Sequence, residues 1–87
     1  MANQMKRILN FFFKILKQMN FPLNLIHKLN YFDIGRWDIV LKNDKLIKLP
    51  KKNYTMSIKK FLSIYEKDNF VNFSVFDFRV KGQLVLK

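Results

Sequence analysis

The sequence contains no cysteine, only two glycines and two prolines, and a single histidine in 87 residues. The absence of cysteine excludes disulfide bonds, thiolate zinc sites and cysteine nucleophiles. The lone histidine, His27, cannot form a conventional zinc site by itself, and no carboxylate lies near it in the sequence to support acid–base catalysis. Gly35 and Gly82 stand alone, which excludes a glycine-rich phosphate loop. We therefore expect no enzymatic activity, no metal and no cofactor.

Acidic residues are also scarce, since six of them against 17 lysines and arginines give a net charge of +11. Such an excess suits nucleic acid, an anionic membrane surface or an acidic protein as the partner. Basic residues interleaved with aromatic ones have the composition of an RNA-binding protein. However, "FDFRV" lacks the glycine of the ribonucleoprotein motif, and Phe76 and Phe78 share a face with Ser74 and Val80, as core residues do. RNA binding is therefore kept as the alternative function.

No apolar run is long enough to cross a membrane. The most apolar segment, "ILNFFFKILK", is interrupted by Asn10 and Lys14, and no small-residue cleavage site follows it, so a signal peptide is not expected either. Apolar residues recur there every three or four positions, at Ile8, Phe12, Ile15 and Met19. This period predicts an amphipathic helix over residues 4–19, with a basic lead-in at 1–7. We expect its apolar face to pack on the domain; attachment to a membrane surface is the alternative.

Apolar residues make up 49% of the chain and aromatic residues 16%, which is enough for the core of one domain over residues 1–87. Asn20 and Pro22 predict the start of a second short helix, which carries His27 as a surface residue. From Leu29 the pattern is that of a strand. Gly35 predicts a bulge or bend from which the strand resumes in a new direction.

The segment "IGRWDIVLKNDKLIKLP", residues 34–50, predicts a β-hairpin over residues 36–49. Large apolar side chains alternate along its first strand, at Trp37, Ile39 and Leu41. This alternation is typical of a strand that is buried on one face. Asn43 and Asp44 form the turn, because both residue types tolerate positive φ.

A second amphipathic helix follows, and either Thr55 or Ser57 is expected to cap its start. Its inward positions are expected to be Ile58, Phe61, Leu62 and Tyr65. The segments "SVFDFRV" and "QLVLK" then return to a strand pattern, with a turn or bend at residues 81–82. The two acidic residues within strands, Asp38 and Asp77, are expected to pair with the neighbouring Arg36 and Arg79.

This order of elements predicts an α+β fold, in which a small antiparallel β-sheet carries the N-terminal helices and one inserted helix on one face. The chain ends within strand sequence. A terminal strand often lies at a sheet edge, where it can recruit a strand of another chain; the alternative is that it pairs internally on both sides.

Two motifs resemble one protein family. "GRWDIVLKNDKLIKLP" is similar to the pattern RRWD-x-x-L-x-N-G-x-x-x-x-LP of the bacterial cell-division family FtsQ, called DivIB in Gram-positive bacteria. About 30 residues later, "FDFRVKGQLVLK" resembles the terminal (I/V)DLR strand pair of the family, in its alphaproteobacterial form. The intervening "IKKFLSIYEK" has the aliphatic spacing of the family's helix. The resemblance covers residues 8–87.

The resemblance implies a non-enzymatic interaction module of the divisome. In this family a transmembrane helix and a periplasmic POTRA domain precede a C-terminal β domain, which binds the FtsB–FtsL pair chiefly by letting FtsB add a strand to its last sheet edge. We therefore expect partners of the FtsB/FtsL type, at the periplasmic face of the inner membrane near the septum. The chain starts at Met1 without a membrane helix or POTRA domain, so we expect the β domain by itself, from a truncated or split gene.

Together with the strand pattern, the resemblance assigns site residues. Those expected to bind the partner are Arg36, Val80, Lys81, Gly82, Gln83, Leu84 and Val85. Those expected to be structural are Trp37, Asp77 and Arg79. The chain departs from the family pattern at three positions: Gly35 replaces the first arginine of RRW, Asp44 replaces the glycine of the turn, and Phe78 replaces the leucine between aspartate and arginine.

Overall fold

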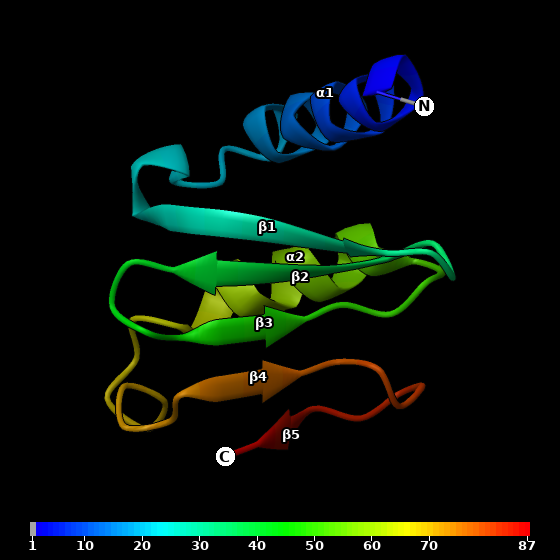
Figure 1. Cartoon of the computed structure of the whole chain (residues 1–87). Helices are drawn as coiled ribbons and strands as arrows, with labels where there is room; N and C mark the ends of the chain where they lie inside the picture. Colours follow the sequence, from blue (N-terminus) through cyan, green and yellow to red (C-terminus); the bar gives the residue numbers. More distant parts are fainter. Residues whose placement is uncertain (1) are drawn as a thin grey trace.

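A computed structural model describes residues 2–87, with side chains described from Gln4 onward (Figure 1). In this part of the chain, three consecutive antiparallel strands lie between the helices, and a short C-terminal strand pair completes the sheet. In chain order the elements are α1 Ala2–Gln18, the 3-10 helix η1 Leu23–Leu25, β1 Ile26–Phe32, β2 Arg36–Leu41, β3 Leu46–Lys48, α2 Tyr54–Ile64, β4 Val75–Asp77 and β5 Val85–Leu86.

The five strands of the described residues form one sheet in the order β1-β2-β3-β4-β5. The α+β class predicted from the sequence is confirmed. Neighbouring strands are antiparallel except β3 and β4, which run parallel. This pair corrects the expectation of a purely antiparallel sheet. The chain leaves β3 through α2, and a helical crossover of this kind returns the next strand in the same direction.

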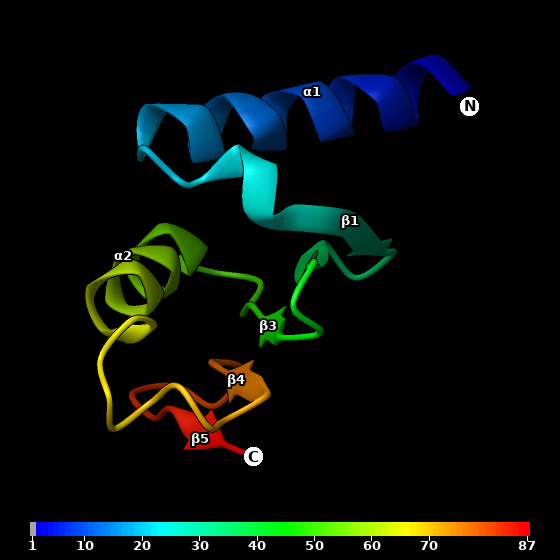
Figure 2. The same cartoon turned by 90° about the vertical axis from the view of Figure 1, so that its left-hand side faces the viewer.

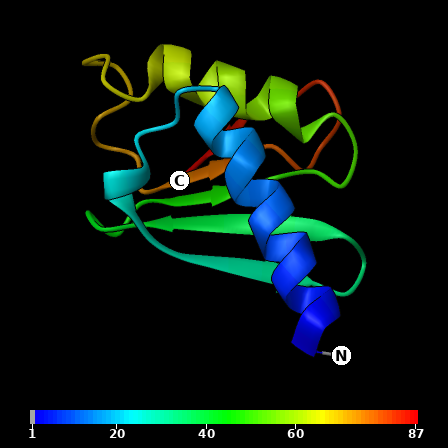
Figure 3. The same ribbon diagram turned by 90° about the horizontal axis from the view of Figure 1, so that it is seen from above.

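Both α-helices bury their apolar side chains on the same face of the sheet. Figure 2 shows α1 over the β1 end of the sheet and α2 beside the middle strands, and Figure 3 shows that α1 crosses the strands obliquely. Phe12 of α1 joins the layers, because its ring stacks on Trp37 of β2 and also contacts Tyr54 at the start of α2. The core therefore lies between the two helices and one sheet face.

Helix α1 begins at Ala2, so most of the expected basic lead-in is already helical; residue 1 lies outside the described residues. Phe12 and Leu16 are fully buried. Of these two, Phe12 belongs to the predicted stripe and Leu16 does not; the remaining residues of the stripe are partly buried, namely Ile8, Ile15 and Met19. The predicted period and the packing on the domain are thus confirmed, and the stripe is centred on two residues one turn apart.

The predicted second helix is wrong. Only the 3-10 turn Leu23–Leu25 forms, and β1 begins at Ile26. This segment pairs with the sheet instead of forming a helix, since the N–H of Lys42 donates to the carbonyl of Leu25 at 2.8 Å. His27 consequently lies exposed on a strand and not on a helix.

Gly35 makes a reverse turn, which corrects the predicted bulge or bend. Its φ is 89°, and its N–H donates to the carbonyl of Phe32 at 2.8 Å. A side chain is strained at this φ, so glycine permits the tight reversal. Strands β1 and β2 therefore form an antiparallel hairpin that starts at the pair Phe32 and Arg36. The register irregularity of β1 lies at its other end, between Ile26 and Lys28.

The predicted hairpin of β2 and β3 is confirmed. Its alternating residues Trp37, Ile39 and Leu41 are all buried. In the turn, the N–H of Asp44 donates to the carbonyl of Leu41 at 3.1 Å. Asp44 has positive φ, 66°, whereas Asn43 does not. The connection is a three-residue loop whose last residue is left-handed.

Helix α2 begins before its expected caps. Asn53 precedes it in the left-handed conformation, with φ 59° and no capping hydrogen bond from its side chain. Thr55 and Ser57 therefore lie inside the helix and cap nothing. The buried residues of α2 are Ile58, Phe61 and Ile64, whereas the predicted Leu62 and Tyr65 are partly buried.

Candidate interaction site

Strand β5 lies at one edge of the sheet and pairs with β4 on one side. Both strands are shorter than the strand segments predicted for them. Leu86 lies opposite Phe76 on the helix-covered face, and Val85 lies opposite Asp77 on the open face. The outer side of an edge strand presents backbone donors and acceptors that another strand can pair with.

Hydrogen bonds to β4 show which backbone groups near β5 point outward. Val75 and Lys87 are paired, since the N–H of each donates to the carbonyl of the other at 3.1 Å. Successive residues of an antiparallel strand direct their N–H and C=O groups to opposite sides. The N–H and C=O of Leu86 therefore point away from β4, and those of Val85 point toward it.

Residues 80–84 belong to the loop between β4 and β5. The turn predicted at residues 81–82 is confirmed, since the N–H of Gln83 donates to the carbonyl of Val80 at 3.0 Å and Gly82 has φ 73°. Val80, Gln83 and Leu84, which were expected on strands, lie in this loop as well, so residues 80–84 take no part in strand pairing. All five line a groove of about 700 Å³ between this loop and the start of α2.

This groove is basic. Its cationic residues are Lys51, Lys52, Lys60, Arg79 and Lys81, and no acidic residue lines it. Met56, which is 71% exposed, and Val80 add apolar surface. Met56 and Lys60 are four residues apart, so they lie on the same side of α2. The contribution of α2 to this groove was not predicted from the sequence, although the four-residue spacing of Met56 and Lys60 indicates that they share a face.

Asp77 and Arg79 form a bidentate ion pair where β4 ends. Nε and Nη2 of Arg79 donate to the two carboxylate oxygens of Asp77 at 2.9 and 2.7 Å, and the Arg79 backbone N–H donates to Oδ1 at 3.0 Å. The hydrogen bonds from Arg79 lower the pKa of Asp77 from 3.8 to about 2, against the opposing effect of burial. The pair therefore fixes the direction in which the chain enters the loop beside the groove.

Arg36 lies on β2, three strands away from β5, which is about 14 Å at the usual strand spacing. Its Nη1 donates to Oδ1 of Asp38 at 2.6 Å and to the carbonyl of Leu49 at 3.2 Å. Its guanidinium group lies over the ring of Phe32, 4.5 Å from the centroid. The expected pairing of both strand aspartates with arginine is thus confirmed. The structure does not bring Arg36 together with residues 80–85.

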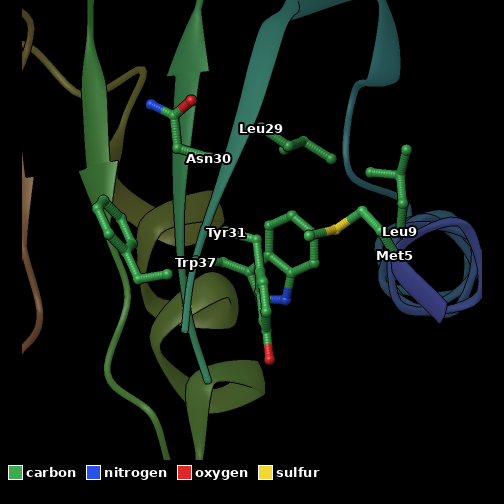
Figure 4. Close-up of a pocket in the computed structure, with 7 residues that line it drawn as sticks. Met5, Leu9, Leu29, Asn30, Tyr31 and Trp37 are labelled. Carbon is green, nitrogen blue, oxygen red and sulfur yellow. The ribbon is translucent and has the colours of Figure 1, made fainter. Parts of the chain in front are cut away.

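A second groove, of about 500 Å³, lies between α1 and β1 and was not foreseen from the sequence. Figure 4 shows Met5 extending from α1 toward the rings of Tyr31 and Trp37. Met5 and Leu9 are one helical turn apart and both line this groove. Trp37 is nevertheless 6% exposed, so its indole forms the floor of the groove and belongs to the core.

The described residues contain no group of three or more side chains suited to hold a metal ion. Phe76 and Phe78, the aromatic residues considered for RNA binding, are buried against the helices, so neither ring is available to stack on a base. Within the described part of the chain, no helix combines the length and the apolarity that a bilayer crossing requires.

A two-layer α+β domain that ends in an open sheet edge beside a basic groove has the form of a protein-interaction domain. The profile of the family described as "Cell division protein FtsQ/DivIB, C-terminal" matches residues 2–79. The chain therefore belongs to the FtsQ/DivIB C-terminal family, as its two motifs predicted. This family is a non-enzymatic division family, and its domain is the periplasmic part of an inner-membrane protein.

The family match ends at Arg79, so the loop 80–84 and β5 lie outside the matched residues. No curated protein sequence matches the chain. A partner-binding role for β5 is therefore an inference from geometry and from the resemblance of "FDFRVKGQLVLK".

Proposed function

We propose that this domain binds a division protein of the FtsB/FtsL type within the divisome by accepting a strand of that protein alongside β5. The observation that carries the proposal is the outward direction of the Leu86 N–H and C=O at the sheet edge. A strand that pairs with these groups extends the sheet by one strand, and its alternate side chains meet the two faces.

The basic groove next to β5 defines the chemistry of this partner. Lys51, Lys60 and Lys81 favour a segment with acidic side chains. Such rim charges raise the association rate and fix orientation more than they raise affinity. Met56 and Val80 offer apolar surface to the same segment. The partner is therefore an acidic chain with apolar side chains next to the added strand.

Arg36 has a separate part in this proposal. Because it lies three strands from β5, only a partner that extends over the open face of the sheet reaches the 12% of its side chain that is exposed. Arg36→Gln then lowers the association rate for such a partner. An unchanged association rate would restrict the binding surface to β5 and the groove.

The test removes one outward N–H without changing a side chain. The chain is made by chemical synthesis with an N-methyl group on Leu86, and a peptide of an FtsB-type protein is titrated by calorimetry. We expect the dissociation constant to rise at least tenfold, because a hydrogen bond is lost and the methyl group blocks strand pairing. Circular dichroism should remain that of the unmodified chain.

Val85→Pro is the matched control. The N–H of Val85 points toward β4, so its removal disturbs the β4–β5 pair and lowers the melting temperature. Unchanged peptide affinity for the folded N-methyl-Leu86 chain would exclude strand addition at β5. Loss of fold in that chain would show that Leu86 is not at an open edge.

A further inference from the structure

The outer face of α1 is a strip of positive charge. Its four cationic residues, Lys6, Arg7, Lys14 and Lys17, are all exposed. At about 100° per residue, each lies roughly 120–160° around the helix from the buried Phe12. No acidic residue occurs in the sequence before Asp33. Nothing on this helix therefore offsets the charge.

Other elements do not neutralise this strip either. The ion pairs found among the described residues involve Arg36 and Arg79, and none involves a residue of α1. Figures 1 and 2 show α1 as the outermost layer of the molecule at the β1 end of the sheet, with no element on its outer side. The four charges consequently face solvent together.

Two phenylalanines flank the strip. Phe11 and Phe13 lie about 100° to either side of the buried Phe12, and they are 64% and 37% exposed. Neither ring is fully buried in the core of the domain. An aromatic ring beside lysine and arginine on a surface helix is a combination suited to the boundary between lipid headgroups and acyl chains.

We propose that the outer face of α1 docks on an anionic lipid surface, with the cations on the headgroups and Phe11 at the acyl boundary. The shape of the face favours this occupant over single-stranded RNA. A straight helix of 17 residues presents its charges on a convex surface, which fits a plane, whereas single-stranded RNA is held in a groove with several stacking rings. Each cation near such a surface contributes several-fold in affinity.

This site is distinct from the sheet edge at β5, where the partner strand is proposed to bind. α1 covers the β1 end of the sheet, and β5 is the opposite edge, about 19 Å away at the usual strand spacing. A domain that lies on the membrane through α1 thus keeps β5 free for a partner. The two interactions can be tested separately.

Binding is measured by flotation with vesicles of phosphatidylcholine and of an equal mixture of phosphatidylcholine and phosphatidylglycerol, in 150 mM salt. The test variant replaces Lys6, Arg7, Lys14 and Lys17 with glutamine. The control variant replaces Lys42, Lys59, Lys67 and Lys87 with glutamine; these residues are also exposed and lie outside the basic groove, and the variant has the same net charge. We expect the test variant to lose roughly 100-fold in partitioning to anionic vesicles, and the control less than about threefold because salt screens distant charges.

Circular dichroism confirms that each variant is folded; the pairs Lys6/Arg7 and Lys14/Lys17 are replaced separately if the quadruple variant is not. Equal losses in the two variants would overturn the proposal, because net charge and not α1 would then determine binding. Retention of single-stranded RNA without retention of anionic vesicles would also overturn it. A Phe11→Trp variant should show blue-shifted emission on anionic vesicles, and unshifted emission would refute the proposed orientation.

Discussion

The indole of Trp37 connects three parts of this small core. It is stacked on Phe12 of α1, with ring centroids 4.4 Å apart and planes inclined by 4°. It also meets Tyr31 of β1 at 4.8 Å. Aromatic pairs of this geometry stabilise a core beyond the area that they bury. The role of the tryptophan in the segment "IGRWDIVLKNDKLIKLP" is therefore packing in the core.

Replacing this side chain should strongly destabilise the domain. Trp37→Ala leaves a cavity under α1, and we expect a loss of about 3–5 kcal/mol in the free energy of unfolding. The total free energy of unfolding of a small domain is about 5–15 kcal/mol, so the melting temperature measured by circular dichroism should fall sharply.

Phe11→Ala is the control for this measurement, because Phe11 is an exposed aromatic residue next to the same stack. It should change the free energy of unfolding by about 0.5 kcal/mol or less. A Trp37→Ala variant that melts like the unmodified chain would show that the indole is not part of the core in solution.

At the level of the elements, the turn of the β2–β3 hairpin contains a residue with a strained backbone conformation. Asp44 has φ 66°, a conformation that costs non-glycine residues energy. The family pattern has glycine at this position, and the hairpin forms here with aspartate. Asn43 supports the turn differently, because its Oδ1 accepts a hydrogen bond from the N–H of Lys45 at 3.2 Å.

We expect Asp44→Gly to stabilise the hairpin. Relief of strain exceeds the entropic cost of glycine, and the net gain should be about 0.5 kcal/mol, which corresponds to a rise of about 2–4 °C in the melting temperature. Asn43→Gly should have the opposite effect, because Asn43 has no positive φ to relieve and loses its hydrogen bond. Destabilisation by Asp44→Gly in a thermal melt would contradict this account of the turn.

At the scale of the whole molecule, the face of the sheet without helices is organised by charge. Asp38 lies opposite Lys48, and Lys48 lies beside Asp77 on the next strand. Arg36 and Arg79 complete this row by pairing with the two aspartates. Both aspartates are 6% exposed. The sequence has only six acidic residues against 17 basic ones, so each of these two ion pairs uses one of the few carboxylates that can balance the basic side chains.

Acid should therefore weaken the fold over a defined range. Arg79 lowers the pKa of Asp77 to about 2 from 3.8, so the stabilisation is complete above about pH 4 and is lost as the pH falls toward 2. We expect this group to contribute about 1–2 kcal/mol, after allowance for the exposure of its partner. Urea unfolding between pH 5 and pH 2 measures the loss.

The matched variants are Asp77→Asn and Asp68→Asn, the second at an exposed position. At pH 5, Asp77→Asn should be less stable than the unmodified chain, and the difference should narrow as the pH approaches 2. Asp68→Asn should follow the unmodified chain throughout. A constant difference for Asp77→Asn across this range would mean that its ionisation is not what stabilises the fold.

Several features were predictable because they depend on neighbours in the sequence. The alternation at Trp37, Ile39 and Leu41 predicted the buried face of β2, and the four-residue spacing around Phe12 predicted the buried face of α1. The pairing of each aspartate with an arginine two residues away was also predictable, since such residues lie on the same side of a strand. The candidate site was harder to predict from the sequence. The turn at residues 81–82 was predictable, but the flanking Val80, Gln83 and Leu84 have a strand-like pattern and lie in the loop.

The sequence by itself determined the class of fold, the inward residues of its main elements and, through two motifs, the family. The fold class and the inward residues follow from local periodicity, which indicates the type of element and the face that it buries. The family follows from the two motifs. Only the tertiary structure decided that the segment after Pro22 joins the sheet and that Gly35 reverses the chain. It also decided that β3 and β4 are parallel and that Leu86 is the outward residue of the edge. Apart from the local turn at Gly35, each of these depends on hydrogen bonds between residues far apart in the chain, and such bonds leave no periodic trace in the sequence around either partner.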